Sequence, residues 1–256
     1  MAKSSYEYVK TFEQTDVILP NTWIVVRVDG KNFHRLADTH QFIKPNDIRS
    51  LDLMNKAASV VMKEIHDIIL SYGQSDEYSF VFERNTKLYR RRSSKILTNV
   101  CSLFTSSFVF HWKDFFPNCD LQYPPSFDGR VVTYPTNRNL RDYLSWRQAD
   151  CHINNLYNTT FWALVQKGDV SRKDAEAQIR HTVSKEKNEI LFSQFGINYN
   201  KEPEQFKKGT LIIRSQIHKN SVVLDSFIEN DGLYISYCDL IGNALWDQNP
   251  HILIKD

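Results

Sequence analysis

Two aspartates stand where apolar runs of the chain break, in a pattern suited to metal-assisted phosphate chemistry. Asp29 follows the run 23–28 and Asp76 comes shortly before the run 78–82, and both runs are expected to be buried strands. Carboxylates at the ends of neighbouring strands can hold Mg²⁺, which takes one or two carboxylates together with substrate phosphates. Gly30 lets the backbone bend so that its own carbonyl can point at a metal. The alternative is a pair of ordinary turn aspartates.

Polar residues follow Asp29 in the stretch 30–45, which is expected to be a loop. Free backbone N–H groups near the glycine, followed by polar side chains, are what phosphate binding needs. The candidate phosphate ligands are Lys31, Asn32, His34 and Lys44. The alternative is a polar loop without a ligand, in which the histidine is partly buried.

A basic run over 90–95 stands at the start of an expected helix, with Ser93 as its cap. Cations at a helix N-terminus oppose the helix dipole, so local stability does not explain them. Anion binding does explain them, since the helix N-terminus and the guanidinium groups would both attract phosphate. The alternative is a solvated charge run.

The segment 152–158 reads HINNLYN and lies within an expected helix, although asparagine has a poor helix propensity. Residues 152, 155 and either 158 or 159 share one face at helical spacing. They would form a polar ridge suited to hydrogen-bonding a sugar, a phosphate or a base. The alternative is a helix end or an internal polar network.

The elements that must position these residues run in the order β-α-β-β-α-β. Strands are expected over 23–28, 68–72, 77–83 and 129–134, and long amphipathic helices after Asn46–Asp47 and after Ser93. This order predicts an α+β, ferredoxin-like fold, a four-stranded antiparallel sheet with two helices on one face. The first strand then lies beside the hairpin, so Asp29 and Asp76 could meet at one edge of the exposed sheet face.

The rest of the chain is expected to be helical and partly β. A short helix over 5–14 would carry Tyr8, Val9 and Phe12 on one face. Further helices are expected over 139–167, from Ser171 onward and over 184–195, and strands over 209–218, 222–224 and 233–237.

Composition narrows the class of protein. The 256 residues can bury a real core, and a formal charge of +2 means that any nucleic-acid partner must be held by a local patch. The four cysteines are scattered without a C-x-x-C pair, which indicates neither a zinc site nor a redox pair but reduced thiols inside a cell. No apolar run approaches the roughly 20 residues that span a bilayer, and no membrane association is expected.

Three segments carry a resemblance to a known family: RVDGKNFH at 27–34, GQSDEY at 73–78 and HINNLYN at 152–158. With them the chain resembles the tRNA-histidine guanylyltransferase family over nearly its whole length. The resemblance implies a palm like that of polymerases and nucleotidyl cyclases, which agrees with the element order. It implies a palm catalytic region over 1–136 and a helical, partly β extension over 137–256, packed as one integrated domain.

The resemblance also implies the reaction. The 5′-monophosphate of tRNA-His is activated with ATP, the 3′-hydroxyl of GTP attacks the activated phosphate and expels AMP, and pyrophosphate is then removed. The strand grows by one guanylate in the 3′–5′ direction. The implied partners are tRNA-His, GTP and ATP, in a homotetramer built as a dimer of dimers, within the cytoplasm, the nucleus or both.

Site residues follow from the resemblance in the same way. Asp29 and Asp76, with the Gly30 carbonyl, would hold two Mg²⁺ ions. Glu77 would stand beside them in catalysis, on the opposite face from Asp76 if its strand is regular. The GTP site would comprise Asp29, Gly30, Lys31, Asn32, Phe33, His34, Lys44, Ser75 and Asp76. Our own candidates, beyond those that the resemblance assigns, are Arg92 and Lys95 for a second triphosphate or the tRNA 5′ end, and His152, Asn155 and Lys187 for the tRNA body.

Three other functions fit many of the same residues. They are a template-directed 3′–5′ tRNA repair polymerase, a palm-type nucleotidyl cyclase, and a non-catalytic protein that binds RNA or a nucleotide. The two aspartates argue against the last, because a pure binder has no need of such a carboxylate pair.

Overall fold

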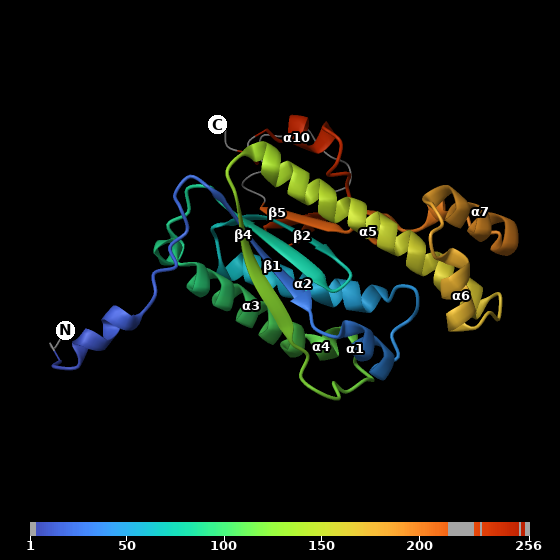
Figure 1. Cartoon of the computed structure of the whole chain (residues 1–256), viewed down its shortest axis with the longest axis horizontal. Coiled ribbons are helices and arrows are strands. Elements are labelled where there is room, and N and C mark those ends of the chain that lie inside the picture. The colour runs from blue at the N-terminus through green and yellow to red at the C-terminus, as the bar shows by residue number, and fades with distance from the viewer. Residues whose placement is uncertain (1–3, 215–227, 231, 251, 254–256) are drawn as a thin grey trace.

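The computed structural model describes residues 4–214, 228–230, 232–250 and 252–253. One seven-stranded sheet forms its centre, in the spatial order β4-β1-β3-β2-β5-β7-β6, and every neighbouring pair of strands is antiparallel (Figure 1). The strands are β1 (Trp23–Gly30), β2 (Ile68–Gln74), β3 (Glu77–Phe82), β4 (Phe127–Tyr134), β5 (Thr210–Arg214), β6 (Ile228–Asn230) and β7 (Leu233–Ser236).

Helices lie on both faces of this sheet. They are α1 (Phe33–Thr39), α2 (Ile48–Glu64), α3 (Ser93–Phe110), α4 (Trp112–Phe115), α5 (Asn137–Gln166), α6 (Arg172–Ile179), α7 (Ser184–Phe195), α8 (Glu204–Lys208) and α10 (Ala244–Gln248), with 3₁₀ helices at Glu7–Phe12, Leu88–Arg91 and Tyr199–Lys201. Among the described residues, no helix combines the length and the apolar character needed to cross a membrane.

The first four strands with α2 and α3 form the ferredoxin-like unit, so the expected fold class is confirmed. Strand alternation divides the core into two layers. Ile24, Val26 and Val28 of β1 pack in one cluster with residues of α2 and α3. Trp23 and Val25, which point the other way, pack in a second cluster with residues of α5. Each face of β1 is therefore covered by helix.

The second face of the sheet was expected to be exposed, and this expectation is wrong. Helix α5, 30 residues long, lies across it (Figure 1). Its N-cap Thr136 accepts a hydrogen bond from the backbone of Asn139, and its residues Leu140, Tyr143 and Leu144 are buried against the sheet. Strands β5, β7 and β6 then extend the same sheet beyond β2. Helix α5 thus covers the sheet near the end of β1, where Asp29 lies.

Other boundaries differ from the expectations in a few places. The stretch 30–45 is not a plain loop but contains α1, whose residues Phe33 and Leu36 are buried in the core. Helix α4 and strand β6 were not anticipated. The strand expected over 209–218 is β5, which ends at Arg214, while 215–218 and the strand expected over 222–224 lie outside the described residues.

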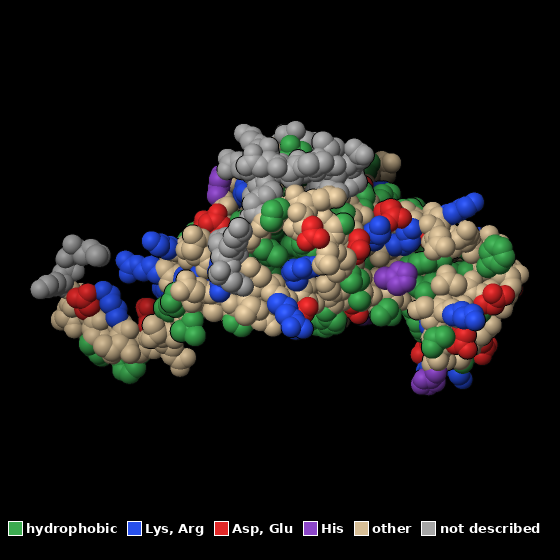
Figure 2. Space-filling view, turned by 90° about the horizontal axis from the view of Figure 1, so that it is seen from above, with side chains coloured by type: hydrophobic (Ala, Val, Ile, Leu, Met, Phe, Trp, Pro, Cys, Tyr) green, Lys and Arg blue, Asp and Glu red, His purple; other side chains and the backbone are tan. Residues whose placement is uncertain are grey.

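The N-terminal segment is an arm rather than an amphipathic helix packed on the body. Only a 3₁₀ helix forms, at Glu7–Phe12, and Tyr8, Val9 and Phe12 are 65%, 51% and 77% exposed. Figures 1 and 2 show this arm projecting from the body, with hydrophobic side chains on its surface. A single short helical segment has little stability of its own, which accounts for the departure from the expected helix.

Arg91 joins the segment after the arm to the segment between β3 and α3. Its side chain is buried and donates hydrogen bonds to several backbone carbonyls. The acceptors are the carbonyls of Ile18, Leu19, Thr22, Arg84 and Thr86, at 2.8–3.3 Å from its nitrogens. This member of the basic run 90–95 therefore acts in folding and not in anion binding.

Replacing Arg91 by Ala is expected to destabilise the protein by about 2–4 kcal/mol, because several buried carbonyls lose their charged donor at once. Denaturant unfolding of the full chain measures this change. Arg90→Ala is the matched control. The Arg90 side chain is next in sequence to Arg91 but exposed, so its loss is expected to change the free energy of unfolding by less than about 0.5 kcal/mol. Equal effects of the two substitutions would contradict the role given to Arg91.

Candidate active site

Asp29 and Asp76 are brought together by the junction of β1 with the β2–β3 turn. Ser75 and Asp76 form this two-residue turn, since Gln74 pairs with Glu77 across it. The turn requires a left-handed backbone at Ser75, whose φ is 49°. The Gly30 N–H donates a 2.9 Å hydrogen bond to the Asp76 carbonyl. This bond ties the turn to the end of β1, directly after Asp29.

This arrangement shifts the pKa of the Asp76 carboxyl group. Burial, with the negative charges of Asp29 and Glu77, raises the pKa of Asp76 from 3.8 to about 6. Hydrogen bonds from its own backbone and from Ser75 oppose the rise without cancelling it. A nearby cation would favour the ionised form. The site thus holds negative charge in a place where a cation is needed to balance it.

Glu77 does not lie where the sequence indicated. Because Asp76 belongs to the turn, strand alternation starts at Glu77, which pairs with Asp29 and so shares its face. Glu77 is buried between Arg147 of α5, which donates bonds of 3.0 and 3.2 Å, and Arg27, whose Nε lies 3.7 Å from Oε2. Burial raises the pKa of Glu77, although both arginines oppose the shift.

The donor set fits Mg²⁺ as a partner shared with a substrate. Two carboxylates, from Asp29 and Asp76, supply the hard oxygen ligands that this ion prefers. No cluster of three or more His, Cys, Asp or Glu side chains suited to a metal occurs in the described ranges. The pair would therefore need the adjacent backbone carbonyl of Gly30 and the oxygens of a phosphate ligand, which is the usual way in which Mg²⁺ is held.

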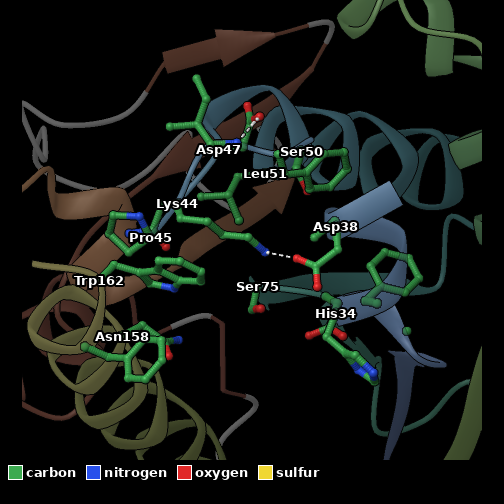
Figure 3. Close-up of a pocket in the computed structure, with 18 of the residues that line it drawn as sticks. His34, Asp38, Lys44, Pro45, Asp47, Ser50, Leu51, Ser75, Asn158 and Trp162 are labelled. Carbon is green, nitrogen blue, oxygen red and sulfur yellow. Dashed lines mark hydrogen bonds and ion pairs between the residues drawn. The ribbon is translucent and has the colours of Figure 1, made fainter. Parts of the chain in front are cut away.

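Two cavities flank the turn, and both are lined by Ser75 and Asp76. The larger, about 660 Å³, extends between α1, the loop before α2 and the far end of α5 (Figure 3). The smaller, about 280 Å³, lies between the turn and α5, and Asp29 and Glu77 line it. The larger volume is within the range typical of small-molecule sites.

Two glycines make room for aromatic rings at this junction. A Cβ on Gly30 would lie 2.3 Å from the ring of Phe33, and a Cβ on Gly73 would lie 2.1 Å from the ring of Tyr78. Neither ring can give way easily, since Phe33 and Tyr78 are both buried. Packing thus requires the glycine after Asp29, independently of any role of its carbonyl as a ligand.

The residues proposed for GTP divide into four groups in the structure, and Asp29 alone forms one of them, since it lines the smaller cavity and not the larger. Gly30, Asn32, His34, Lys44 and Ser75 line the larger cavity with Asp76. Phe33 also borders it, but its ring is 8% exposed and packs against Phe108 and Phe127. Lys31 instead lines a separate small pocket with Tyr123. His34 is an exposed residue of α1 and not a partly buried loop histidine.

Lys44 is already engaged inside the cavity. Its Nζ lies 3.2 Å from Oδ1 of Asp38, and Figure 3 shows the side chain reaching across the cavity toward that carboxylate. The backbone around Lys44 is fixed by Asp47, which accepts a hydrogen bond from the Ile43 N–H and caps α2. Only the flexible side chain of Lys44 is thus free to move toward a ligand.

The basic run at the start of α3 already has an anion, supplied by the chain. Asp16 accepts a hydrogen bond from the Ser94 N–H and lies 3.6 Å from Nε of Arg92. Arg92, not Ser93, stands at the N-cap, and no side chain of α3 caps it. Lys95 lies 5.7 Å from the ring centroid of Tyr89. A phosphate at this helix end would have to compete with Asp16.

The polar ridge of α5 is split between the interior and the surface. Asn155 is buried and bonds both Asn46 and Tyr199 at 2.9 Å, which is the internal network that the sequence left open. His152 is exposed, with its ring 5.5 Å from that of Tyr199. Lys187 is 9% exposed and donates a 2.6 Å bond to the Thr182 carbonyl.

Several lining residues were not anticipated from the sequence. Helices α5 and α6 supply the wall of the larger cavity opposite α1, through Tyr157, Asn158, Phe161, Trp162, Arg172 and Glu176. Tyr157 and Asn158 belong to the HINNLYN segment, so a signal for them existed. Trp162 and Arg172 have no local signal, because their place in the wall depends on how α5 crosses the sheet.

Family models match most of the chain. Residues 6–135 match the model described as tRNAHis guanylyltransferase, and residues 138–233 match the Thg1 C terminal domain. A probable tRNA(His) guanylyltransferase of Bos taurus is 51% identical over 268 residues, covering 100% of this chain and 90% of the relative. The tRNA(His) guanylyltransferase of Schizosaccharomyces pombe is 53% identical, with 98% of each chain covered.

Solved structures show the same fold. The crystal structure of the tRNA(His) guanylyltransferase from Saccharomyces cerevisiae has a TM-score of 0.78 and 50% identity, covering 82% of this chain and 93% of that chain. A bacterial tRNA(His) guanylyltransferase-like protein in complex with ATP has a TM-score of 0.74, with 96% of each chain covered. At 20% identity, the latter likeness is one of fold alone.

Asp76→Asn is expected to stabilise the metal-free protein at neutral pH. The unfolded carboxyl ionises near pH 3.8 and the folded one near pH 6, so the native state loses stability as pH rises across this window. The asparagine variant avoids this loss, which amounts to at most about 3 kcal/mol. Unfolding in EDTA at pH 7.5 and pH 4 measures the gain, which should be largely absent at pH 4.

The control for this measurement is Asp128→Asn. Asp128 lies opposite Asp29 on β4, but its side chain is 59% exposed. Its replacement is expected to change stability by less than about 0.5 kcal/mol at either pH. An Asp76→Asn variant that is less stable than the wild type at pH 7.5 in EDTA would refute the electrostatic interpretation of the site.

Proposed function

The chain belongs to the tRNA(His) guanylyltransferase family, and we propose that it adds one guanylate to the 5′ end of tRNA-His in the 3′–5′ direction. The observation that carries this proposal is the pairing of Asp76, which lines the 660 Å³ cavity, with Asp29, which lines the adjoining 280 Å³ cavity. Coupled carboxylates at the edge of such a cavity suit phosphoryl transfer, in which catalysis is mostly positioning and charge stabilisation.

The proposed reaction has three steps. The 5′-monophosphate of the tRNA attacks the α-phosphate of ATP, which releases pyrophosphate and leaves an adenylylated 5′ end. The 3′-hydroxyl of GTP then attacks that 5′ phosphate and expels AMP, so that the triphosphate of GTP becomes the new 5′ end. Water finally cleaves this end and releases pyrophosphate, which leaves a 5′-monophosphate.

Asp29, Asp76 and the Gly30 carbonyl are proposed to hold two Mg²⁺ ions. Bound there, the ions would lower the pKa of the attacking hydroxyl and stabilise the leaving group. The buried Glu77 adds a negative charge that Arg147 and Arg27 offset, so it acts as a neighbour of the ligands and not as one of them.

GTP is proposed to lie in the larger cavity, with its triphosphate against Ser75 and the segment 29–34, where β1 ends and α1 begins. The polar side chains of Asn32 and His34 suit this role, since both residues line the cavity, whereas the N–H groups of Gly30 and Lys31 already donate to the carbonyls of Asp76 and Ser126. Lys44 would exchange Asp38 for a phosphate, which carries more negative charge. Lys31 lines the neighbouring pocket and its N–H already donates a 2.9 Å hydrogen bond to the Ser126 carbonyl, so it would contribute through the charge of its side chain.

The RNA contacts are proposed at two places. Arg92 and Lys95 would take a second triphosphate or the tRNA 5′ end, once Asp16 releases the start of α3. The exposed His152 would touch the tRNA body. Asn155 and Lys187, which have internal partners, would act by holding the surface around it. Basic side chains on the face seen in Figure 2 stand in separate groups among acidic ones.

A homotetramer in the cytoplasm or nucleus is part of the same proposal. The projecting arm exposes Tyr6, Tyr8 and Phe12 by 74%, 65% and 77%, and contiguous exposed apolar side chains mark protein–protein contacts. The four cysteines are free thiols, which suits a reducing compartment.

Asp29→Ala and Asp76→Ala are expected to lower Mg²⁺-dependent labelling of 5′-phosphorylated tRNA-His by GTP at least about a hundredfold, because each removes a metal ligand. Gel analysis of labelled RNA measures this loss, with melting curves to show that the variants are folded. Asp128→Ala, the matched control on β4, should retain activity, since it lines neither cavity. Full activity in either active-site variant would exclude that residue as a ligand.

The alternative functions give different products in the same assay. A nucleotidyl cyclase would convert GTP to a cyclic product without RNA. A repair polymerase would extend 5′-truncated tRNAs as readily as tRNA-His. A non-catalytic binder would retain RNA and GTP but release neither AMP nor pyrophosphate.

A further inference from the structure

The wall of the larger cavity formed by α5 and α6 contains a tryptophan that is flanked by two cations. Nζ of Lys44 lies 5.7 Å and the guanidinium carbon of Arg172 lies 5.2 Å from the centroid of the Trp162 ring. All three residues line the cavity (Figure 3 labels Lys44 and Trp162). Both distances are within the range in which an indole face attracts a cation.

Helix stability does not explain why Arg172 stands at this position. It is the first residue of α6, where a positive charge opposes the helix dipole. The cap is supplied by Ser171, which accepts a hydrogen bond from the Asp174 N–H. The position of Arg172 is therefore better explained by what lies across the cavity.

Arg172 is also not neutralised by a carboxylate within the described ranges. Glu176, one turn further along α6, lines the same cavity, but its carboxylate bonds Arg180 at 2.9 Å. Lys44 has a carboxylate partner in Asp38, and the Asp38 side chain is 55% exposed. Two cations thus lie beside one ring, and among the described residues the one carboxylate paired with them is that of Asp38, which a ligand could replace.

Two positive charges beside one ring attract an anion that both of them can reach. A phosphate chain is the anion that matches a guanidinium and an ammonium group best, since it carries several charged oxygens. The opposite wall of the cavity carries Ser75 and Asp76, beside which the triphosphate is proposed to lie. A phosphate chain held there would have both walls in reach.

We propose that Arg172 and Lys44, held on the ring of Trp162, form a second phosphate-binding wall of the active-site cavity. Arg172 and Trp162 are new to the site, and they bring the helical extension into direct contact with the ligand. This inference rests on the proposed function, because that function brings a phosphate-bearing ligand into the cavity. That ligand has two possible sources, the triphosphate of the free nucleotide and the phosphorylated 5′ end of the RNA.

Direct binding to the full-length chain tests this wall without any transfer reaction. Equilibrium dialysis with labelled GTP and with labelled GMP, both in Mg²⁺, compares wild type with Arg172→Ala. Loss of one charge-assisted contact is expected to weaken GTP binding about tenfold and GMP binding much less. Arg172→Lys should recover part of the loss, because the charge remains but the guanidinium fork does not.

Lys173→Ala is the matched control for charge and place. Lys173 is exposed, follows Arg172 directly and does not line the cavity. Its removal changes the net charge equally but should leave GTP binding within about twofold. Melting curves of both variants establish that α6 still packs on α5.

A second arm distinguishes the source of the phosphate. It compares the binding of 5′-phosphorylated and 5′-hydroxyl tRNA-His to wild type and Arg172→Ala. A loss confined to the phosphorylated RNA assigns the wall to the RNA end, and a loss that grows from GMP to GTP assigns it to the nucleotide. If folded Arg172→Ala shows neither phosphate-dependent loss, the proposed wall is refuted.

A tryptophan signal gives an independent readout. Trp23, Trp112 and Trp246 are buried, so Trp146 and Trp162 are the more accessible indoles. Binding of a phosphate chain to the two cations beside Trp162 is expected to change the fluorescence of this indole. The change should vanish in Trp162→Phe and persist in Trp146→Phe. If the fluorescence change persists in Trp162→Phe, the proposed contact of the ligand with the Trp162 wall is contradicted. This conclusion holds even if the wild type transfers guanylate. If the wild type binds GTP with the Trp162-dependent fluorescence change but transfers no guanylate, the proposed function is contradicted and the phosphate-binding wall is not.

Discussion

Negative charge concentrated at a half-buried junction, by the carboxylates of Asp29 and Asp76, is the constraint on which the rest of the site depends. Asp29 ends β1 and Asp76 belongs to the β2–β3 turn, and the hydrogen bond from the Gly30 N–H to the Asp76 carbonyl holds the two segments together. Burial raises the pKa of Asp76 to about 6, with the charge of Asp29 adding to the rise. Such a junction favours the binding of a cation.

The surrounding structure limits how much negative charge the junction carries. Glu77 would add a third carboxylate on the face of Asp29, but Arg147 donates two hydrogen bonds to it and Arg27 lies close by. Arg147 comes from α5, the helix that also roofs the sheet and supplies a wall of the larger cavity. One long helix thus compensates charge near the proposed metal ligands and shapes the place where a nucleotide would lie.

The ferredoxin-like unit could be predicted from the sequence because its evidence is local. Apolar runs and helical spacing mark β1, α2, the hairpin and α3, and the β-α-β-β-α-β order then places Asp29 beside the hairpin. The face of Glu77 was predicted wrongly, since alternation was counted from Asp76. The two-residue turn removes Asp76 from the strand, and only the observed pairing of Gln74 with Glu77 reveals this.

Other features depend on contacts between distant segments and left no local signal. Arg91 and Arg92 are neighbours in one basic run, yet Arg91 is buried among backbone carbonyls while Arg92 faces Asp16. Which arginine is buried is decided by the path of residues 17–22, which the run itself does not encode. Trp162 and Arg172 reach the cavity only because α5 spans the sheet and α6 folds back beside its end.

The most direct test of the central claim is a measurement of metal binding at this junction. Mn²⁺ accepts the same oxygen ligands as Mg²⁺ and is detected by electron paramagnetic resonance. With GTP present, the full chain should bind Mn²⁺, and Asp76→Asn should weaken that binding at least about tenfold while Asp128→Asn leaves it unchanged. Undiminished Mn²⁺ binding in both Asp29→Asn and Asp76→Asn would contradict a metal centre formed by these two carboxylates.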